Sequence, residues 1–180
     1  YTLAYPILQK YGMKATIFSI GVSFGKDHYK DTDYAMTPHF GAAEAAEMAA
    51  SGLISIQSHT YDMHQWPPYE DGSAAVRENI LQLPGESEEA YVEALTADFT
   101  RSRAQLEAAT GRPVDVLAYP AGQYSTLAQV TLQNLGVHVT LSTNPGINTV
   151  VKGLPQTLTA MLRFGVTEGL SPEALLVMIK

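Results

Sequence analysis

The chain has 180 residues, of which 46% are hydrophobic and 16% charged, and its formal net charge is -7 at pH 7. These values are typical of one folded domain with a sizeable core and exclude a disordered chain. The acidic balance and the absence of any Lys/Arg cluster argue against a nucleic-acid-binding surface. Without cysteine there is no disulfide framework and no thiolate zinc site, and no apolar run reaches the ~18 residues of a membrane span.

The first half of the chain alternates helical and strand patterns. Apolar residues at helical spacing predict a helix over residues 2–10, and the β-branched and aromatic run at 14–21 predicts a buried strand. An alanine-rich helix is expected over 41–50, followed by a short strand over 53–57.

The second half continues the alternation. An irregular stretch is expected to hold a short helix over 73–82, and acidic residues at the start of 86–110 favour a long helix there. Further helices are expected at 125–135, begun by Ser125, and after Ser171. Strands are expected over residues 114–119, 137–141 and 161–166.

This order implies a parallel sheet wrapped by helices in a single α/β domain spanning residues 1–180. Five strands are too few for a closed barrel, and the opening helix lacks the strand that should precede it. We therefore expect an incomplete barrel whose first strand lies upstream of Tyr1.

Two histidines carry the clearest chemical pattern. His59 and His64 lie five residues apart in Ser-His-Thr-Tyr-Asp-Met-His, directly after the strand predicted over 53–57. Barrel enzymes keep their chemistry at strand exits, and ligands on one helix would be spaced by three or four. The pair is a candidate metal site, because neutral imidazole is the commonest metal ligand; two ordinary loop histidines are the alternative.

Several blocks of the chain resemble the polysaccharide deacetylases, the NodB-homology enzymes of carbohydrate esterase family 4. Residues 5–18 resemble the stretch after the family's first motif, 58–64 its second motif, 118–122 its third, and 162–164 fall where the late motifs lie. The resemblance implies a distorted (β/α) barrel that removes acetyl groups from N- or O-acetylated glycans. It also implies a divalent metal, expected to be zinc, held by one aspartate and two histidines, with a second aspartate as general base.

Carried over residue by residue, the resemblance makes His59 and His64 the metal ligands and the backbone N–H of Ala121 the oxyanion donor. Tyr119 and Tyr124 would line the substrate groove, with barrel packing as the alternative, and Trp66 would be a sugar platform or a lid. Arg163 lies near the family's late histidine and would orient a carboxylate or hold substrate; an ordinary salt bridge is its alternative role.

The sequence departs from the family pattern in three places. It contains no Asp-Asp pair, so the third ligand and the base of the first motif are absent from these residues. Ala118 stands where the third motif usually has an arginine, and no late histidine follows a leucine.

The leading hypothesis is a metal-dependent deacetylase of an acetylated polysaccharide. The five-residue histidine spacing, found in a subset resembling the poly-N-acetylglucosamine deacetylases, favours an N-acetylglucosamine-type glycan. A non-catalytic glycan-binding relative is the main alternative, and a hydrolase of small amides is a weaker one. We expect a bacterial protein of the cell envelope or exterior, although these residues include no signal peptide.

Overall fold

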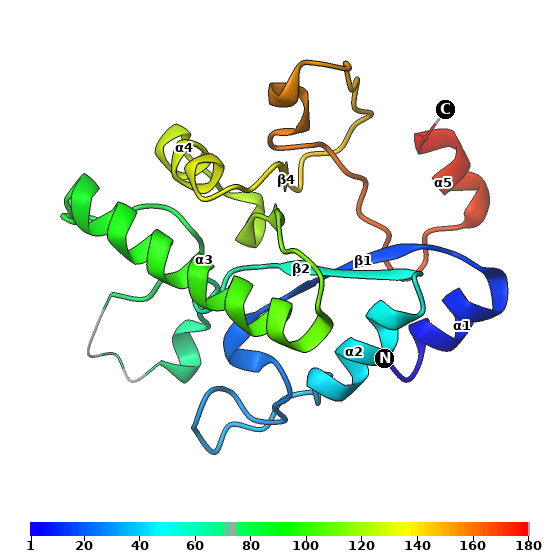
Figure 1. Cartoon of the computed structure of the whole chain (residues 1–180), viewed down its shortest axis with the longest axis horizontal. Coiled ribbons are helices and arrows are strands. Elements are labelled where there is room, and N and C mark those ends of the chain that lie inside the picture. The colour runs from blue at the N-terminus through cyan, green and yellow to red at the C-terminus, as the bar shows by residue number, and fades with distance from the viewer. Residues whose placement is uncertain (71, 73–74, 180) are drawn as a thin grey trace.

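The computed structural model describes residues 1–70, 72 and 75–179 (Figure 1). Its elements alternate largely as the sequence predicts. No helix among these residues is long and apolar enough to cross a membrane. In chain order the elements are α1 (Ala4–Tyr11), β1 (Ala15–Ser19), α2 (Ala42–Ala50), β2 (Ile54–Ser58), α3 (Glu88–Thr110), β3 (Val116–Ala118), α4 (Thr126–Asn134), β4 (Val139–Leu141) and α5 (Pro172–Met178).

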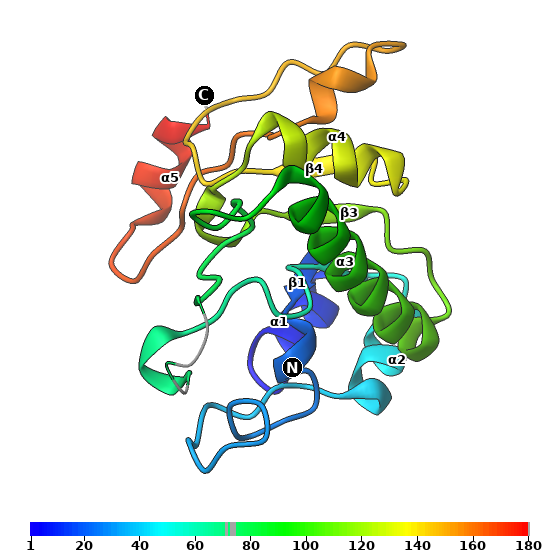
Figure 2. The ribbon, with the colours of Figure 1, turned by 90° about the vertical axis from the view of Figure 1, so that its left-hand side faces the viewer.

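The strands form one parallel sheet in the order β1-β2-β3-β4, which is also their order along the chain. The sheet is open within the described residues, so the expectation of an incomplete α/β barrel is confirmed (Figures 1 and 2). β3 starts two residues later than predicted because the Gln57 side chain accepts the N–H groups of Asp115 and Val116 at 3.1 and 3.0 Å.

The predicted strand over residues 161–166 is wrong beyond its first residue. Met161 makes a single parallel bridge with Leu141 of β4. The next two N–H groups then turn away from the ladder: Leu162 donates to the Asn148 side chain at 2.8 Å and Arg163 to the Asn144 carbonyl at 2.9 Å. Competing loop acceptors therefore end the strand at once.

The short helix predicted over residues 73–82 is also wrong over its described part, 75–82. Tertiary partners take the backbone groups that a helix would use. The Arg77 carbonyl accepts the Gln65 N–H, and the Arg77 N–H donates to the Gln65 side-chain oxygen. The Glu78 carbonyl contacts His64, and the Ile80 carbonyl accepts the Tyr91 hydroxyl. Residues 73 and 74 lie outside the described residues.

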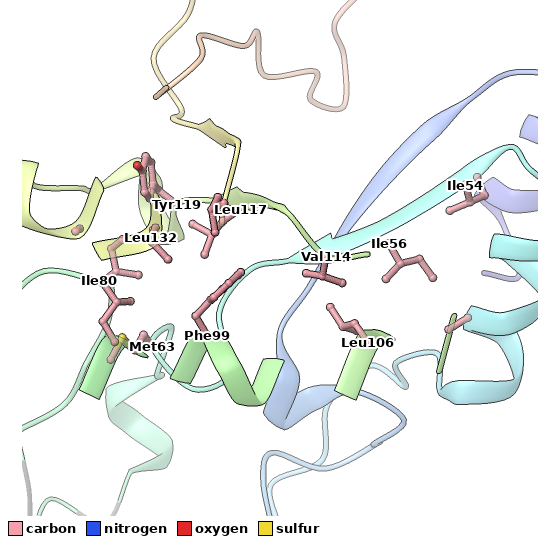
Figure 3. Close-up of a cluster of buried hydrophobic side chains, with 14 of the residues drawn as sticks. Ile54, Ile56, Met63, Ile80, Phe99, Leu106, Val114, Leu117, Tyr119 and Leu132 are labelled. Atoms are coloured by element: carbon pink, nitrogen blue, oxygen red, sulfur yellow. The ribbon is translucent and has the colours of Figure 1, made fainter. Parts of the chain in front are cut away.

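The core lies between the sheet and α3. Ser87 caps this 23-residue helix by accepting the Ala90 N–H, and Gly111 ends it in the left-handed conformation. Figure 3 shows Phe99 and Leu106 directed from α3 at the sheet, with Leu117 of β3 beside Phe99. All three side chains are fully buried, so the register of α3 on the sheet is fixed by close packing.

The other face of the sheet is open. Thr16 and Ser55, which pair across β1 and β2, are exposed on it. A cavity of about 620 Å³ runs over this face toward the amino ends of the strands, reaching Arg112 and Asp115. It excludes both histidines, which lie beyond the carboxyl end of β2, where parallel sheets usually bind ligands.

Phe99→Ala should destabilise the chain by about 3–5 kcal/mol, because it leaves a cavity where α3 meets the sheet. The control Val177→Ala, at a position 75% exposed on α5, should change stability by no more than about 0.5 kcal/mol. Urea denaturation followed by circular dichroism measures both. Equal effects would mean that α3 does not anchor the fold.

Candidate functional site

The two histidines come together at the carboxyl end of β2. His59 continues β2 by donating its N–H to the Ser19 carbonyl of β1 at 2.9 Å, and its Nδ1 lies 2.7 Å from the Ala118 carbonyl of β3. The His64 Nδ1 lies 2.9 Å from the Glu78 carbonyl. The two rings meet edge to face with their centroids 5.2 Å apart.

These contacts fix which nitrogen of each ring can bind a cation. A carbonyl oxygen only accepts, so each Nδ1 must carry the proton and each Nε2 presents its lone pair. This second contact is the one that orients metal-binding histidines in proteins. One tetrahedral zinc held by two imidazole nitrogens at about 2.1 Å would place the ring centroids about 5 Å apart, so the pair fits two positions of such a site.

His59 is neutral at physiological pH. Burial lowers its pKa to about 4, against the Ala118 carbonyl, which raises it; His64 and the Arg163 guanidinium lower it further. A neutral imidazole is the form that binds a metal, so this environment keeps His59 ready as a ligand.

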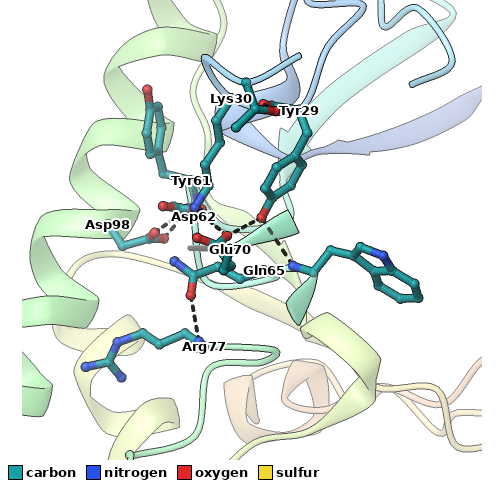
Figure 4. Close-up of polar contacts among 10 residues, drawn as sticks. Tyr29, Lys30, Tyr61, Asp62, Gln65, Glu70, Arg77 and Asp98 are labelled. Atoms are coloured by element: carbon teal, nitrogen blue, oxygen red, sulfur yellow. Dashed lines mark hydrogen bonds and ion pairs between the residues drawn. The ribbon is translucent and has the colours of Figure 1, made fainter. Parts of the chain in front are cut away.

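The described residues hold no group of three His, Cys, Asp or Glu side chains that could bind a metal. Asp62, which lies between the histidines in sequence, has its carboxylate 3.0 Å from the Lys30 ammonium instead. Lys30 also contacts Glu70 at 2.6 Å, which joins the loop containing Lys30 to the one after the histidines (Figures 2 and 4). A third ligand is therefore not supplied by the residues described.

The turn after β3 brings Ala121 to the same edge of the sheet. Ala121 has φ 52° and ψ 14°, an uncommon left-handed conformation for a residue with a Cβ. Its N–H has no hydrogen-bond partner among the described residues, unlike those of Gly122 and Gln123. A strained turn with a free N–H has the chemistry of an oxyanion donor.

The three aromatic residues predicted for the groove differ in exposure. Tyr119 is fully buried in the core, so the expectation that it lines a groove is wrong: its ring packs under Tyr124, with centroids 4.8 Å apart and planes 19° apart. Tyr124 is 37% exposed and Trp66 57% exposed, so both can offer a ring to a ligand.

Arg163 lies close enough to His59 to lower its pKa. Its Nε donates to the Ser142 carbonyl at 2.7 Å, which fixes the guanidinium plane at the end of β4. No carboxylate among the described residues pairs with it.

Sequence reasoning missed Asp98 on α3. Its two carboxylate oxygens accept the N–H groups of Tyr61 and Asp62 at 2.8 and 2.6 Å, inside the histidine segment. Burial raises its pKa to about 6 although both N–H donors lower it. An aspartate three residues after Leu95 and one before Phe99, beside the buried face of the helix, could have signalled a polar contact.

The sequence and the fold match one family. Residues 1–140 match the family model described as "Polysaccharide deacetylase", and the chain therefore belongs to the polysaccharide deacetylase family.

Two curated relatives are similar in sequence. "Putative polysaccharide deacetylase YxkH" of Bacillus subtilis (strain 168) is 29% identical over 174 residues, which are 97% of this chain and 50% of that protein. The poly-beta-1,6-N-acetyl-D-glucosamine N-deacetylase of Staphylococcus aureus (strain MRSA252) is 38% identical over 64 residues, which are 36% of this chain and 20% of that protein. The chain thus spans half the length of the first relative and less of the second.

Solved structures share the fold. A de-N-acetylase from Aggregatibacter actinomycetemcomitans has a TM-score of 0.79 and 18% identity, over 99% of this chain and 70% of that one. IcaB from Ammonifex degensii has a TM-score of 0.73 and 24% identity, over 100% of this chain and 68% of that one.

His59→Asn should remove the loss of stability on acidification that a neutral, buried imidazole causes. In the metal-free protein, the lowered pKa of His59 gives stability that is present above pH 6.5 and lost as pH falls toward 4. The raised pKa of Asp98 acts with the opposite sign in both proteins, so the difference between them isolates His59. Between pH 6.5 and 5 the change in the free energy of unfolding should be about 1–2 kcal/mol less favourable in the native protein than in the variant. Urea denaturation with EDTA at both pH values measures this; equal changes would contradict a neutral, buried His59.

Gly122→Ala should distort the turn that carries Ala121. Gly122 has φ +70°, and a Cβ there would lie 2.1 Å from the Thr143 Oγ1 and 2.8 Å from its backbone nitrogen. The control Gly111→Ala has φ +62° but open space, so it should lose only the left-handed penalty of about 1–2 kcal/mol. Thermal unfolding should show the larger loss for Gly122→Ala. Equal losses of stability would mean that Thr143 moves aside without a measurable energetic cost.

Proposed function

We propose that this chain is the metal- and glycan-binding part of a zinc-dependent deacetylase acting on N-acetylglucosamine-type polysaccharides. One observation carries the proposal: two imidazoles 5.2 Å apart have their Nδ1 atoms held by carbonyls, which leaves both Nε2 lone pairs available. The family supplies the reaction class.

A bound zinc would polarise the acetyl carbonyl and activate a water. His59 and His64 would hold the ion from the carboxyl end of β2. The Ala121 N–H would donate to the oxygen on which negative charge develops. The third ligand and the base would be the aspartates of the family's first motif, which these 180 residues do not contain.

The remaining site residues would bind the glycan and control the charge of His59. Tyr124, stacked on Tyr119, would offer its face to a sugar ring, and exposed Trp66, two residues after His64, would offer a second ring. The Arg163 cation would keep His59 uncharged and attract the developing negative charge. Both relatives are bacterial proteins, which supports the expectation of a bacterial envelope or extracellular glycan.

His64→Ala should abolish zinc-dependent acetate release from poly-N-acetylglucosamine and remove the bound ion without unfolding the chain. The control His39→Ala changes an exposed loop histidine and should leave both properties intact. Elemental analysis measures zinc per chain, and an enzymatic acetate assay measures turnover. The protein should be tested in its natural length, since the chain spans half of its first relative.

Acetate release by His64→Ala with metal depleted would reject the site. A wild-type protein that binds the glycan but releases no acetate, with or without zinc, would instead identify the non-catalytic glycan-binding relative. Acetate release from acetylated xylan alone would retain the deacetylase and reject the N-acetylglucosamine substrate.

A further inference from the structure

The segment between the two histidines is strained. Thr60 has φ 71°, and a β-branched residue in the left-handed region is a genuine outlier. Its side chain is fully buried, and its hydroxyl has no hydrogen-bond partner among the described residues. Such conformations cost on the order of 1–3 kcal/mol and persist only where neighbouring contacts hold them.

Asp98 supplies the contacts on one side. The Tyr61 N–H donates to its Oδ1 at 2.8 Å and the Asp62 N–H donates to its Oδ2 at 2.6 Å, so one carboxylate holds two consecutive peptide groups directly after Thr60 (Figure 4). Charge-assisted hydrogen bonds of this kind are about twice as strong as neutral ones. Close packing of α3 on the sheet fixes the carboxylate in turn.

β1 and the turn after it hold the other side. Gly21 and Val22 donate their N–H groups to the carbonyls of Thr60 and Tyr61 at 3.1 and 2.9 Å. The approach is so close that a Cβ on Gly21 would lie 2.2 Å from the Tyr61 ring. The Ser58 hydroxyl also accepts the Thr60 N–H at 3.1 Å, and Lys30 pairs with the Asp62 carboxylate. Asp98 is the side chain that accepts two consecutive peptide N–H groups of the segment, opposite the backbone of Gly21 and Val22.

We infer that Asp98 is a positioning residue that sets the relative placement of His59 and His64. It touches neither imidazole. It acts through the peptide groups of Tyr61 and Asp62, which keep the chain in the sharp turn that brings the second ring back to 5.2 Å from the first. The inference rests on the proposed function only for the role of the pair as zinc ligands.

Asp98→Asn tests this. An amide offers one acceptor atom in place of two and turns an N–H donor toward a peptide N–H. The matched control is Glu107→Gln: Glu107 lies on the same helix and accepts the Val114 N–H at 2.9 Å, but at the amino end of β3. Asp98→Glu keeps the charge while displacing the carboxylate.

Two readouts separate positioning from general stability. The first is the imidazole ¹⁵N spectrum of the metal-free protein at pH 8, with His39 as internal reference. The second is zinc affinity by competition with a chromophoric chelator. Asp98→Asn should shift or broaden the His59 and His64 signals and weaken zinc binding by about tenfold. Glu107→Gln should change neither, and Asp98→Glu should fall between Asp98→Asn and the native protein.

Unchanged imidazole signals in Asp98→Asn, or equal changes in Glu107→Gln, would overturn the inference. If Asp98→Asn does not fold, Asp98→Glu decides: altered histidine signals support positioning, and native signals reject it. If the native protein binds no zinc, the proposed metal site fails, but the imidazole spectra still decide the role of Asp98.

Discussion

The packing of α3 against β2 is the constraint on which the rest of the structure depends. The same helix that buries Phe99 and Leu106 in the core also presents a polar row at helical spacing, Asp98, Ser102 and Gln105. Ser102 bonds Ser58 at the last residue of β2, and Gln105 donates to the Gly21 carbonyl beyond β1. One helix therefore places both the core and the carboxyl ends of two strands.

The sequence predicts the alternating helices and strands well, because these elements depend on interactions between residues close together in the chain. Apolar periodicity and the residues Ser125 and Ser171 locate the starts of two helices, and both serine side chains accept an N–H group in the first turn. The predictions over 162–166 and 75–82 were wrong because distant partners take the backbone groups. The Asn148 side chain accepts the Leu162 N–H in one case, and in the other the Gln65 side chain accepts the Arg77 N–H while the His64 ring contacts the Glu78 carbonyl. These hydrogen bonds join segments that are separated in sequence, so the spacing of apolar residues does not predict them.

The candidate site shows the same division. Spacing and position after a strand were enough to single out His59 and His64, and the structure places them together. Spacing could not show that Tyr119 is buried against Tyr124. Nor could it show that the Asp62 carboxylate contacts Lys30. Both contacts depend on the direction in which a side chain points from a turn. Asp98 lies 34 residues after His64, on a helix whose buried residues are mostly apolar. Only the three-dimensional structure shows that its carboxylate accepts the N–H groups of Tyr61 and Asp62.

Asp98 and His59 also oppose each other in the response of the fold to pH. Burial raises the pKa of Asp98 to about 6, so its contribution to stability is present below pH 3.8 and is lost as pH rises through 6. Burial lowers the pKa of His59 to about 4, so its contribution is present above pH 6.5 and is lost as pH falls through 4. Between pH 4 and 6 the two slopes have opposite signs and similar size. The cost of burying a neutral His59 at low pH is thus offset by the protonation of buried Asp98, which holds the next peptide groups, and the fold accommodates both groups.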